Sequence, residues 1–200
     1  MPKTKEQFTQ IRNKRINVIL KEALTLFAYK GYDAVNLDEV TRAANCSHGL
    51  LYHYFKGKEE LYKAVLEKIV YPRSKEFVTG VDFNRKAKLV ISDLLDVTTD
   101  ILKSNNDENV QIMYLLLNTH LQKSLNAVKK NEKGHTYFYS TIEDLVERGK
   151  KEGDFKDYST IELTISLLSL VKGLAFNRMH IGHKRFICPH SEIMMEILLK

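Results

Sequence analysis

Apolar side chains recur at three- and four-residue intervals along most of the chain, which is the spacing of one face of an α-helix. The first such stripe runs from Ile16 to Phe27, and it is followed by Gly31, a residue type that commonly closes helices. Alternating runs of β-branched residues are missing, and only three prolines and nine glycines interrupt the 200 residues. The pattern predicts an all-α protein of about nine helices.

Two short helices are predicted to meet at a tight turn in the first third of the chain. Asn36 can cap the first of them, with Glu39 at the third helical position as in a variant of the capping box. Asn45 stands where the turn needs a left-handed backbone, which asparagine tolerates better than other non-glycine residues. Ser47 can then cap the second helix.

The remaining helices are predicted from the same periodicity. A helix that begins near Lys58 is expected to kink or stop near Pro72. Longer helices are expected over 84–104, 109–129, 136–151 and 159–181, with a short last helix over 191–200. We expect a helix-turn-helix domain over 1–57, a connecting helix over 58–72 and a C-terminal helical bundle over 73–200.

The composition narrows the class of protein. Most of the formal net charge of +6 lies in the first third of the chain, which favours a nucleic-acid partner for that part. Cys46 and Cys188 stand far apart without a CxxC spacing, so we expect no disulfide framework and a reducing compartment. No stretch approaches the roughly 20 apolar residues of a membrane span, and we expect a cytoplasmic protein.

The second short helix carries a candidate surface for DNA. On a helix over 47–55, Leu51 and Phe55 share the face that the core needs, whereas Gly49, Tyr52 and His53 share the opposite face. A helix-turn-helix places the N-terminal part of its second helix against base edges, while flanking hydroxyls and cations hold phosphates. The segment supplies each of these groups.

The segment "RINVILKEALTLFAYKGYDAVNLDEVTRAANCSHGLLYHYFKGKEELYKAVLE" resembles the N-terminal DNA-binding domain of the tetracycline-repressor (TetR) family. The order and spacing of "GLLYHYFKGKEEL" are more specific than a helix-turn-helix pattern alone. The resemblance covers about residues 11–70. It implies a homodimeric repressor that binds a DNA operator and whose C-terminal helical domain binds a small-molecule effector.

The resemblance also implies which residues contact DNA. By this resemblance, Ser47, His48, Gly49 and Leu50 are expected to approach base edges. Tyr52, His53 and Lys58 are expected to reach phosphates or nearby bases. Thr41 and Arg42 on the preceding helix are further candidates, with solvated surface as the alternative. The chain departs from the family at Asn45, Cys46 and Leu50, where glycine, an aliphatic residue and a small residue are usual. Leu50 can instead contact a thymine methyl group.

Basic residues near the N-terminus form a further candidate, either an arm that follows phosphates or a frayed terminus. They are Lys3, Lys5, Arg12, Lys14 and Arg15.

The C-terminal helices predict a dimer and a pocket. The helix over 159–181 is apolar around most of its circumference and must be covered from both sides, by a symmetry mate or by its own bundle. The candidate dimer contacts are Leu167, Leu170, Leu174, Ile193, Ile197 and Leu198. The candidate pocket residues, for each of which core packing is the alternative, are Phe77, Met113, Tyr114, Leu117, His120, Tyr137, Phe138 and Phe176.

Other chemistry finds less support. His180, His183, Cys188 and His190 are competent metal ligands, but their spacing fits no zinc module, and we expect neither a metal nor a cofactor. No Gly-rich phosphate loop, nucleophile elbow or paired-carboxylate motif is present, so an enzyme is not expected. Two alternatives stay open: an architectural DNA binder without a ligand, and a small-molecule-binding helical protein.

Overall fold

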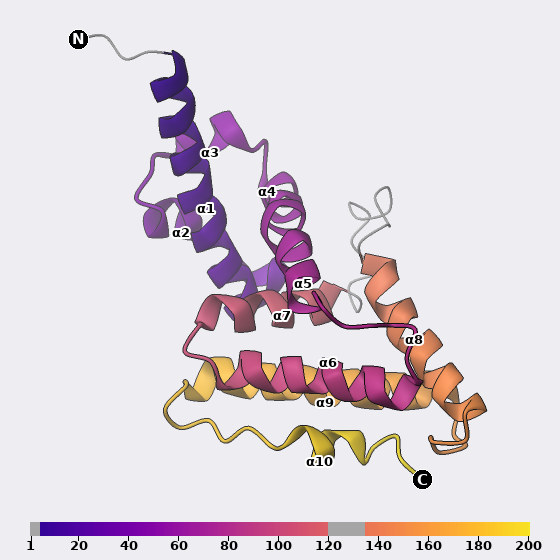
Figure 1. Cartoon of the computed structure of the whole chain (residues 1–200). Coiled ribbons are helices and arrows are strands. Elements are labelled where there is room, and N and C mark those ends of the chain that lie inside the picture. The colour runs from indigo at the N-terminus through magenta and orange to yellow at the C-terminus, as the bar shows by residue number, and fades with distance from the viewer. Residues whose placement is uncertain (1–4, 120–134) are drawn as a thin grey trace. The chain divides into compact units, whose positions relative to one another are not determined.

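The computed structural model describes residues 5–119 and 135–200, and these residues are helical throughout most of their length (Figure 1). Among them, the only β pairing is an isolated antiparallel bridge between Phe155 and Leu199. The chain forms two compact units, Met1–Val70 and Tyr71–Lys200. The all-α class predicted from the periodicity is confirmed.

The first unit is built from four α-helices and a π-helical turn. They are α1 (Lys5–Ala34), α2 (Leu37–Ala43), α3 (His48–Tyr54), α4 (Lys58–Val65) and η1 (Leu66–Val70). The long α1 packs against α4 and α2, and Ile19, Leu24 and Phe27 of its apolar stripe are fully buried. Helical geometry breaks at Gly31, where φ is 78°. Glycine adopts this left-handed backbone at little cost, so α1 is interrupted at the residue where the sequence predicts its end.

The short helices begin at the predicted caps. The Asn36 side chain accepts a hydrogen bond from the Asp38 amide at 2.9 Å, and the Glu39 carboxylate accepts one from the Asn36 amide at 3.4 Å, which completes the capping box. Ser47 Oγ accepts a hydrogen bond from the Leu50 amide at 3.2 Å. Asn45 has a φ of 46° in the turn between the two helices, as predicted.

The second unit contains the remaining helices. They are α5 (Tyr71–Phe77), α6 (Ala87–Lys103), α7 (Asp107–Thr119), α8 (His135–Lys151), α9 (Thr160–Ile181) and α10 (Ser191–Met195). The long α9 packs against α6, α7 and α8, and α10 packs against α6 (Figure 1). By length and composition α9 could cross a membrane, but its contacts with three neighbouring helices are those of a bundle helix.

The predicted helix from Lys58 is interrupted near Pro72 but does not stop there: α4 ends at Val65, the π-helical turn η1 follows, and the helical run continues through Pro72 into α5. The predicted end of the last helix is wrong. The last helix ends at Met195 instead of continuing to Lys200. Beyond it the backbone pairs with another segment: Lys156 donates its amide hydrogen to the Leu198 carbonyl at 2.7 Å.

A buried arginine joins three helices of the second unit. Arg178, in the last turns of α9, is only 1% exposed. Its Nε donates to the Leu102 carbonyl at 3.0 Å, and its Nη2 donates to the Ser104 carbonyl and to Asp107 Oδ1, both at 2.9 Å. The guanidinium therefore ties α9 to the end of α6 and to the start of α7.

The end of α8 is packed against an aromatic ring. Phe155 is 1% exposed, and its ring lies directly on Gly149 of α8. A Cβ atom at position 149 would come within 2.1 Å of the ring. Only glycine fits here, because any side chain would displace a buried aromatic residue.

Candidate nucleic-acid interface

The face of α3 that points away from the core is open to solvent. Tyr52 is 53% exposed, and His53 and Gly49 are also exposed. A side chain added at Gly49 would meet no atom within 4 Å, so a flat partner can approach the helix backbone there. On the opposite face, Leu51 and Phe55 are buried. The structure thus separates the two faces of the helix as the spacing predicts.

The N-terminal end of α3 presents polar side chains. His48 is exposed, and its Nε2 lies 3.5 Å from Oδ1 of Asp38, in the first turn of α2. Ser47 accepts the Leu50 amide hydrogen, and its hydroxyl group keeps its own hydrogen to donate. Leu50 is half-buried. Histidine, serine and the open glycine therefore lie together at one end of the helix.

The two candidate DNA contacts on α2, Thr41 and Arg42, differ in exposure. Thr41 is 3% exposed, and its Oγ1 donates to the Asp38 carbonyl at 2.9 Å, so its side chain lies inside the unit and not on the candidate surface. Arg42 is exposed. Of the two, only Arg42 can reach a partner without a rearrangement.

Lys58 is engaged within its own unit. Its Nζ donates to the Asp33 carbonyl at 3.0 Å and lies 4.7 Å from the centroid of the Tyr32 ring. The lysine therefore connects the start of α4 to the segment after Gly31. To reach a phosphate, its ammonium group would have to exchange these contacts for the new one.

Two arginines of α1 lie beside the helix-turn-helix. The sequence alone assigns both arginines only to a basic arm. Arg15 donates from Nη2 to the carbonyl of Asn45 in the turn, and the guanidinium of Arg12 lies 5.7 Å from the centroid of the Tyr54 ring. Both residues belong to the regular helix α1. Lys3 and the side chain of Lys5 lie outside the described residues. No local motif signals the pairing of Arg15 with a carbonyl 30 residues away.

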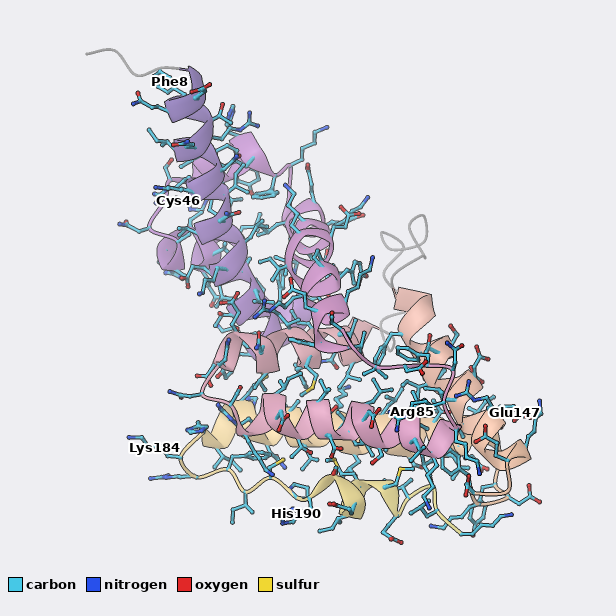
Figure 2. The ribbon with its side chains drawn as sticks, viewed as in Figure 1. Phe8, Cys46, Arg85, Glu147, Lys184 and His190 are labelled. Carbon is cyan, nitrogen blue, oxygen red and sulfur yellow. The ribbon has the colours of Figure 1, made fainter. Side chains whose placement is uncertain are left out.

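Cys46 lies in the same turn (Figure 2). Burial raises the pKa of its thiol, and the nearby charge of Arg15 opposes this shift only in part. A raised pKa keeps the thiol protonated, which favours a packing role over a reactive thiolate.

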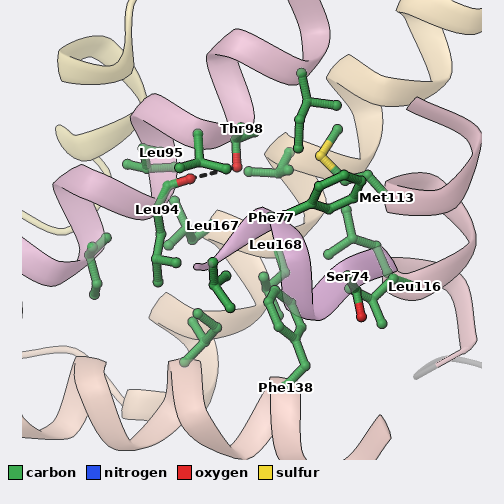
Figure 3. A pocket seen from close by; sticks show the side chains of 17 residues that line it. Ser74, Phe77, Leu94, Leu95, Thr98, Met113, Leu116, Phe138, Leu167 and Leu168 are labelled. Atoms are coloured by element: carbon green, nitrogen blue, oxygen red, sulfur yellow. Dashed lines mark hydrogen bonds between the residues drawn. The ribbon is translucent and has the colours of Figure 1, made fainter. Parts of the chain in front are cut away.

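An apolar cavity of about 70 Å³ lies inside the second unit, between α5, α6, α7, α8 and α9 (Figure 3). Four candidate pocket residues line it: Phe77, Met113, Leu117 and Phe138. Tyr114 and Phe176 are not part of the lining, and their rings lie 6.1 Å apart. His120 and the side chain of Tyr137 lie outside the described residues.

The candidate dimer residues fall on different faces. Leu167 and Leu198 are buried within the chain, at 3% and 0% exposure, and Leu167 lines the cavity. Leu170, Leu174 and Ile197 are half-buried, whereas Ile193 is 60% exposed. The two buried leucines therefore belong to the core of their own subunit. The sequence-based selection took apolar residues without knowing which side of α9 faces the bundle.

Sequence reasoning missed the exposed apolar face of α9. Ile161, Ile165 and Phe176 are 54%, 50% and 44% exposed. Their spacing puts them along one side of the helix, and the apolar circumference of α9 was the signal that could have found them.

The histidines near the end of α9 contact backbone carbonyls. His180 Nδ1 lies 2.9 Å from the Phe176 carbonyl, and its ring stacks on the Phe176 ring at 4.0 Å between centroids. His183 Nε2 lies 3.1 Å from the Lys103 carbonyl. Within residues 5–119 and 135–200, no three His, Cys, Asp or Glu side chains are grouped as metal ligands.

Two capped helices joined by a tight turn, with a solvent-facing second helix, define a helix-turn-helix protein. Residues 19–65 match the family model described as "Bacterial regulatory proteins, tetR family". The biofilm operon icaADBC HTH-type negative transcriptional regulator IcaR of Staphylococcus epidermidis is 39% identical over 49 residues, which are 24% of this chain and 26% of IcaR. The chain therefore aligns with about a quarter of that regulator's length.

The fold likeness extends over the whole chain. A crystal structure of a HlyIIR mutant protein superposes with a TM-score of 0.68 and 20% identity and covers 100% of both chains. The transcriptional regulator FadR from Bacillus subtilis, in complex with stearoyl-CoA, has a TM-score of 0.64 and 15% identity over 92% of this chain and 97% of its own. The match to the tetR family of bacterial regulatory proteins thus covers residues 19–65, and the fold of the whole chain is like that of these two proteins.

Proposed function

We propose that the chain is a DNA-binding transcriptional repressor that acts in the cytoplasm as a homodimer and leaves its operator when a small molecule binds the second unit. The observation that carries this proposal is the open face of α3, where Tyr52, His53 and Gly49 are exposed opposite the buried Leu51 and Phe55. The name of IcaR, a negative transcriptional regulator, supports repression. A regulatory family and the lack of a catalytic motif support a role without catalysis.

In the proposed complex, the N-terminal end of α3 enters the major groove. His48 and Leu50 contact base edges, and Gly49 lets the helix backbone approach closely. Ser47, Tyr52, His53 and Arg42 contact phosphates or neighbouring bases, which sets the register without specifying sequence. Lys58 reaches a phosphate only after releasing the Asp33 carbonyl.

The exposed apolar side of α9 supports a dimer. A second copy would cover Ile161, Ile165 and Phe176, which a single chain leaves half-exposed. Ile165→Asp is therefore expected to yield monomers in sedimentation experiments. Ile187→Asp is the matched control, because Ile187 is 88% exposed and lies outside α9. An unchanged dimer in Ile165→Asp would place the interface elsewhere.

The cavity of the second unit supports a ligand response over the architectural alternative, which needs only a packed bundle. The FadR neighbour was crystallised in complex with stearoyl-CoA, so one protein of this fold binds a small molecule. A ligand that binds the DNA-incompetent conformation better lowers the affinity for the operator, and saturating operator lowers the affinity for the ligand by the same factor.

The test of DNA binding uses duplexes that the full chain selects from a random library, followed by fluorescence anisotropy. We expect an approximate palindrome, because a symmetric dimer reads two half-sites. Tyr52→Phe should weaken binding to every duplex, whereas His48→Ala should change the preferred sequence. Tyr158→Phe is the control, because Tyr158 is 63% exposed and lies in the second unit. Selection of no duplex, or unchanged binding in both α3 variants, would refute the proposal.

A further inference from the structure

Among the residues that the structure describes, the lining of the cavity in the second unit carries no charged group. Of the 17 residues that line it, only Ser74 and Thr98 are polar, and the others are aliphatic, aromatic or methionine side chains. Ionised groups enter such surroundings only at a large cost unless a partner compensates them. The lining supplies no such partner, so the cavity discriminates against ions.

The two hydroxyl groups already donate to their own helices. Thr98 Oγ1 donates to the Leu94 carbonyl at 2.8 Å, as the dashed line in Figure 3 shows. Ser74 Oγ donates to the Tyr71 carbonyl at 2.9 Å. Both hydrogens are therefore used, and a carboxylate or phosphate in the cavity would find no donor on these side chains.

The described lining is only partly enclosed. Ile91 and Leu95, at 1% and 3% exposure, are buried, whereas other lining residues, including Phe138 and Leu168, are half-buried. A volume of about 70 Å³ is several times the space that one water molecule needs, and apolar cavities stay dry. Met113 is flexible and can adjust to an occupant. A cavity of about 150 Å³ holds a benzene ring, so a cavity of about 70 Å³ fits a short alkyl chain and not a whole ring.

We propose that the effector of this protein is an uncharged, hydrocarbon-rich molecule that inserts a short alkyl chain between α5, α6, α7, α8 and α9. This inference rests on the proposed function, in which the second unit binds the effector. The cavity recognises the effector by apolar contact, with no ion pair and no hydrogen bond from Ser74 or Thr98.

The test compares three probes of similar size in calorimetry and thermal unfolding of the full chain: n-butylbenzene, 4-phenylbutyrate and 4-phenylbutylammonium. We expect n-butylbenzene to bind and both ions to bind at least roughly tenfold more weakly, because each would bury an uncompensated charge. Binding of either ion as tightly as n-butylbenzene, or no binding of n-butylbenzene, would overturn the inference.

Substitutions in the lining test whether n-butylbenzene binds inside the cavity. Leu94→Phe and Leu168→Phe each add volume to the lining and should weaken n-butylbenzene binding at least roughly tenfold, and circular dichroism checks that each variant folds. Leu89→Phe is the matched control, because Leu89 lies on the same helix as Leu94, is 44% exposed and is not part of the lining. If Leu89→Phe weakened binding as much as both lining variants, the probe would sit elsewhere and the inference would fall.

A hydroxyl-free variant tests the mode of recognition. Thr98→Val should leave the affinity for n-butylbenzene, and for any effector found later, within about twofold, because the Thr98 hydroxyl group donates its hydrogen to the Leu94 carbonyl and not to the ligand. A tenfold loss for the effector would show recognition by a hydrogen bond and would contradict the inference.

The same samples separate this inference from the proposed function. If n-butylbenzene binds as expected and the chain selects no duplex, DNA binding fails while the apolar site stands. If the chain selects a palindrome but prefers either ion, the apolar site fails while DNA binding stands.

Discussion

The two units rely on hydrogen bonds of different reach along the sequence. In the first unit, the bonds that begin α2 and α3 join residues two or three positions apart, such as Asn36 with Asp38 and Ser47 with Leu50. In the second unit, Arg178 bonds a carbonyl 76 positions away, and Ser191 bonds Asp96 across 95 positions. The starts of α2 and α3 are therefore specified by short motifs. Arg15 and Lys58 of the first unit reach carbonyls 30 and 25 positions away, but only the second unit has pairings across more than 70 positions in this comparison.

This difference has a consequence for function. A helix-turn-helix whose helix starts are fixed by local caps can keep α3 in place while its exposed residues vary. In a bundle stabilised by a few distant polar contacts, residues that line the cavity can vary at many positions while those contacts keep the helices together. The four predictions that follow test this contrast, and hydrogen exchange read by mass spectrometry follows each unit separately.

The largest effect is expected at the long-range contact of the second unit. Arg178→Met removes the donors for two carbonyls and should lower the free energy of unfolding by about 3 kcal/mol, because buried acceptors lose their partners. Faster exchange should be confined to the second unit. Arg185→Met is the control, because Arg185 is exposed. Equal losses of unfolding free energy in the two variants would contradict the claim that the buried contacts of Arg178 stabilise the second unit.

A smaller loss is expected at the glycine under Phe155. Gly149→Ala should cost about 2 kcal/mol, because the new methyl group overlaps a buried ring. Gly173→Ala in α9 meets no atom within 4 Å and should stabilise the chain slightly, because alanine favours helices. The measurement is urea unfolding followed by circular dichroism. Restoration of stability when Gly149→Ala is combined with Phe155→Leu would identify the ring as the cause.

The local contacts of the first unit should each contribute less. Asn36→Ala removes the cap of α2 and should cost about 1 kcal/mol, with faster exchange at the start of α2 and no change in the second unit. Asn13→Ala, within α1, serves as the comparison. If the loss spread to both units, the contrast between local and distant specification would not hold.

The smallest effect is a pH dependence at Glu39. A hydrogen bond from Lys30 and a second from the Asn36 amide hold the pKa of its carboxyl group below the ordinary value. The ionised form stabilises the folded state, so its contribution is complete above about pH 4.5 and is lost as the pH falls through the lowered pKa. Glu39→Gln should flatten this acid dependence in the first unit, whereas Glu196→Gln should leave it unchanged.

The fold of the first unit could be predicted in detail, because each of its signals is local. The capping box at Asn36, the left-handed Asn45 and the helix-closing Gly31 are all visible within a few residues of sequence. Among the candidate DNA contacts, the helical phase placed Leu51 inside and Tyr52 outside. The phase could not place Thr41, whose burial depends on how α2 packs in the unit.

The second unit resisted prediction where distant segments meet. Nothing near Arg178 announces that its guanidinium will be buried against Leu102 and Ser104. Leu198 reads as an interface residue at the end of an apolar run, yet the pairing of that segment with residues 154–156 buries it. The lining of the cavity was found in part, since aromatic and thioether residues predict an interior but not which of them faces a space.

Two of the three contacts of Arg178 are with the backbone carbonyls of Leu102 and Ser104. Neither acid nor an oxidant changes a backbone carbonyl, so these contacts give the link between α9 and the end of α6 no chemical release. A signal that reaches these helices must therefore arrive as displacement. The end of α9, the end of α6 and the start of α7, which meet at Arg178, are then displaced together.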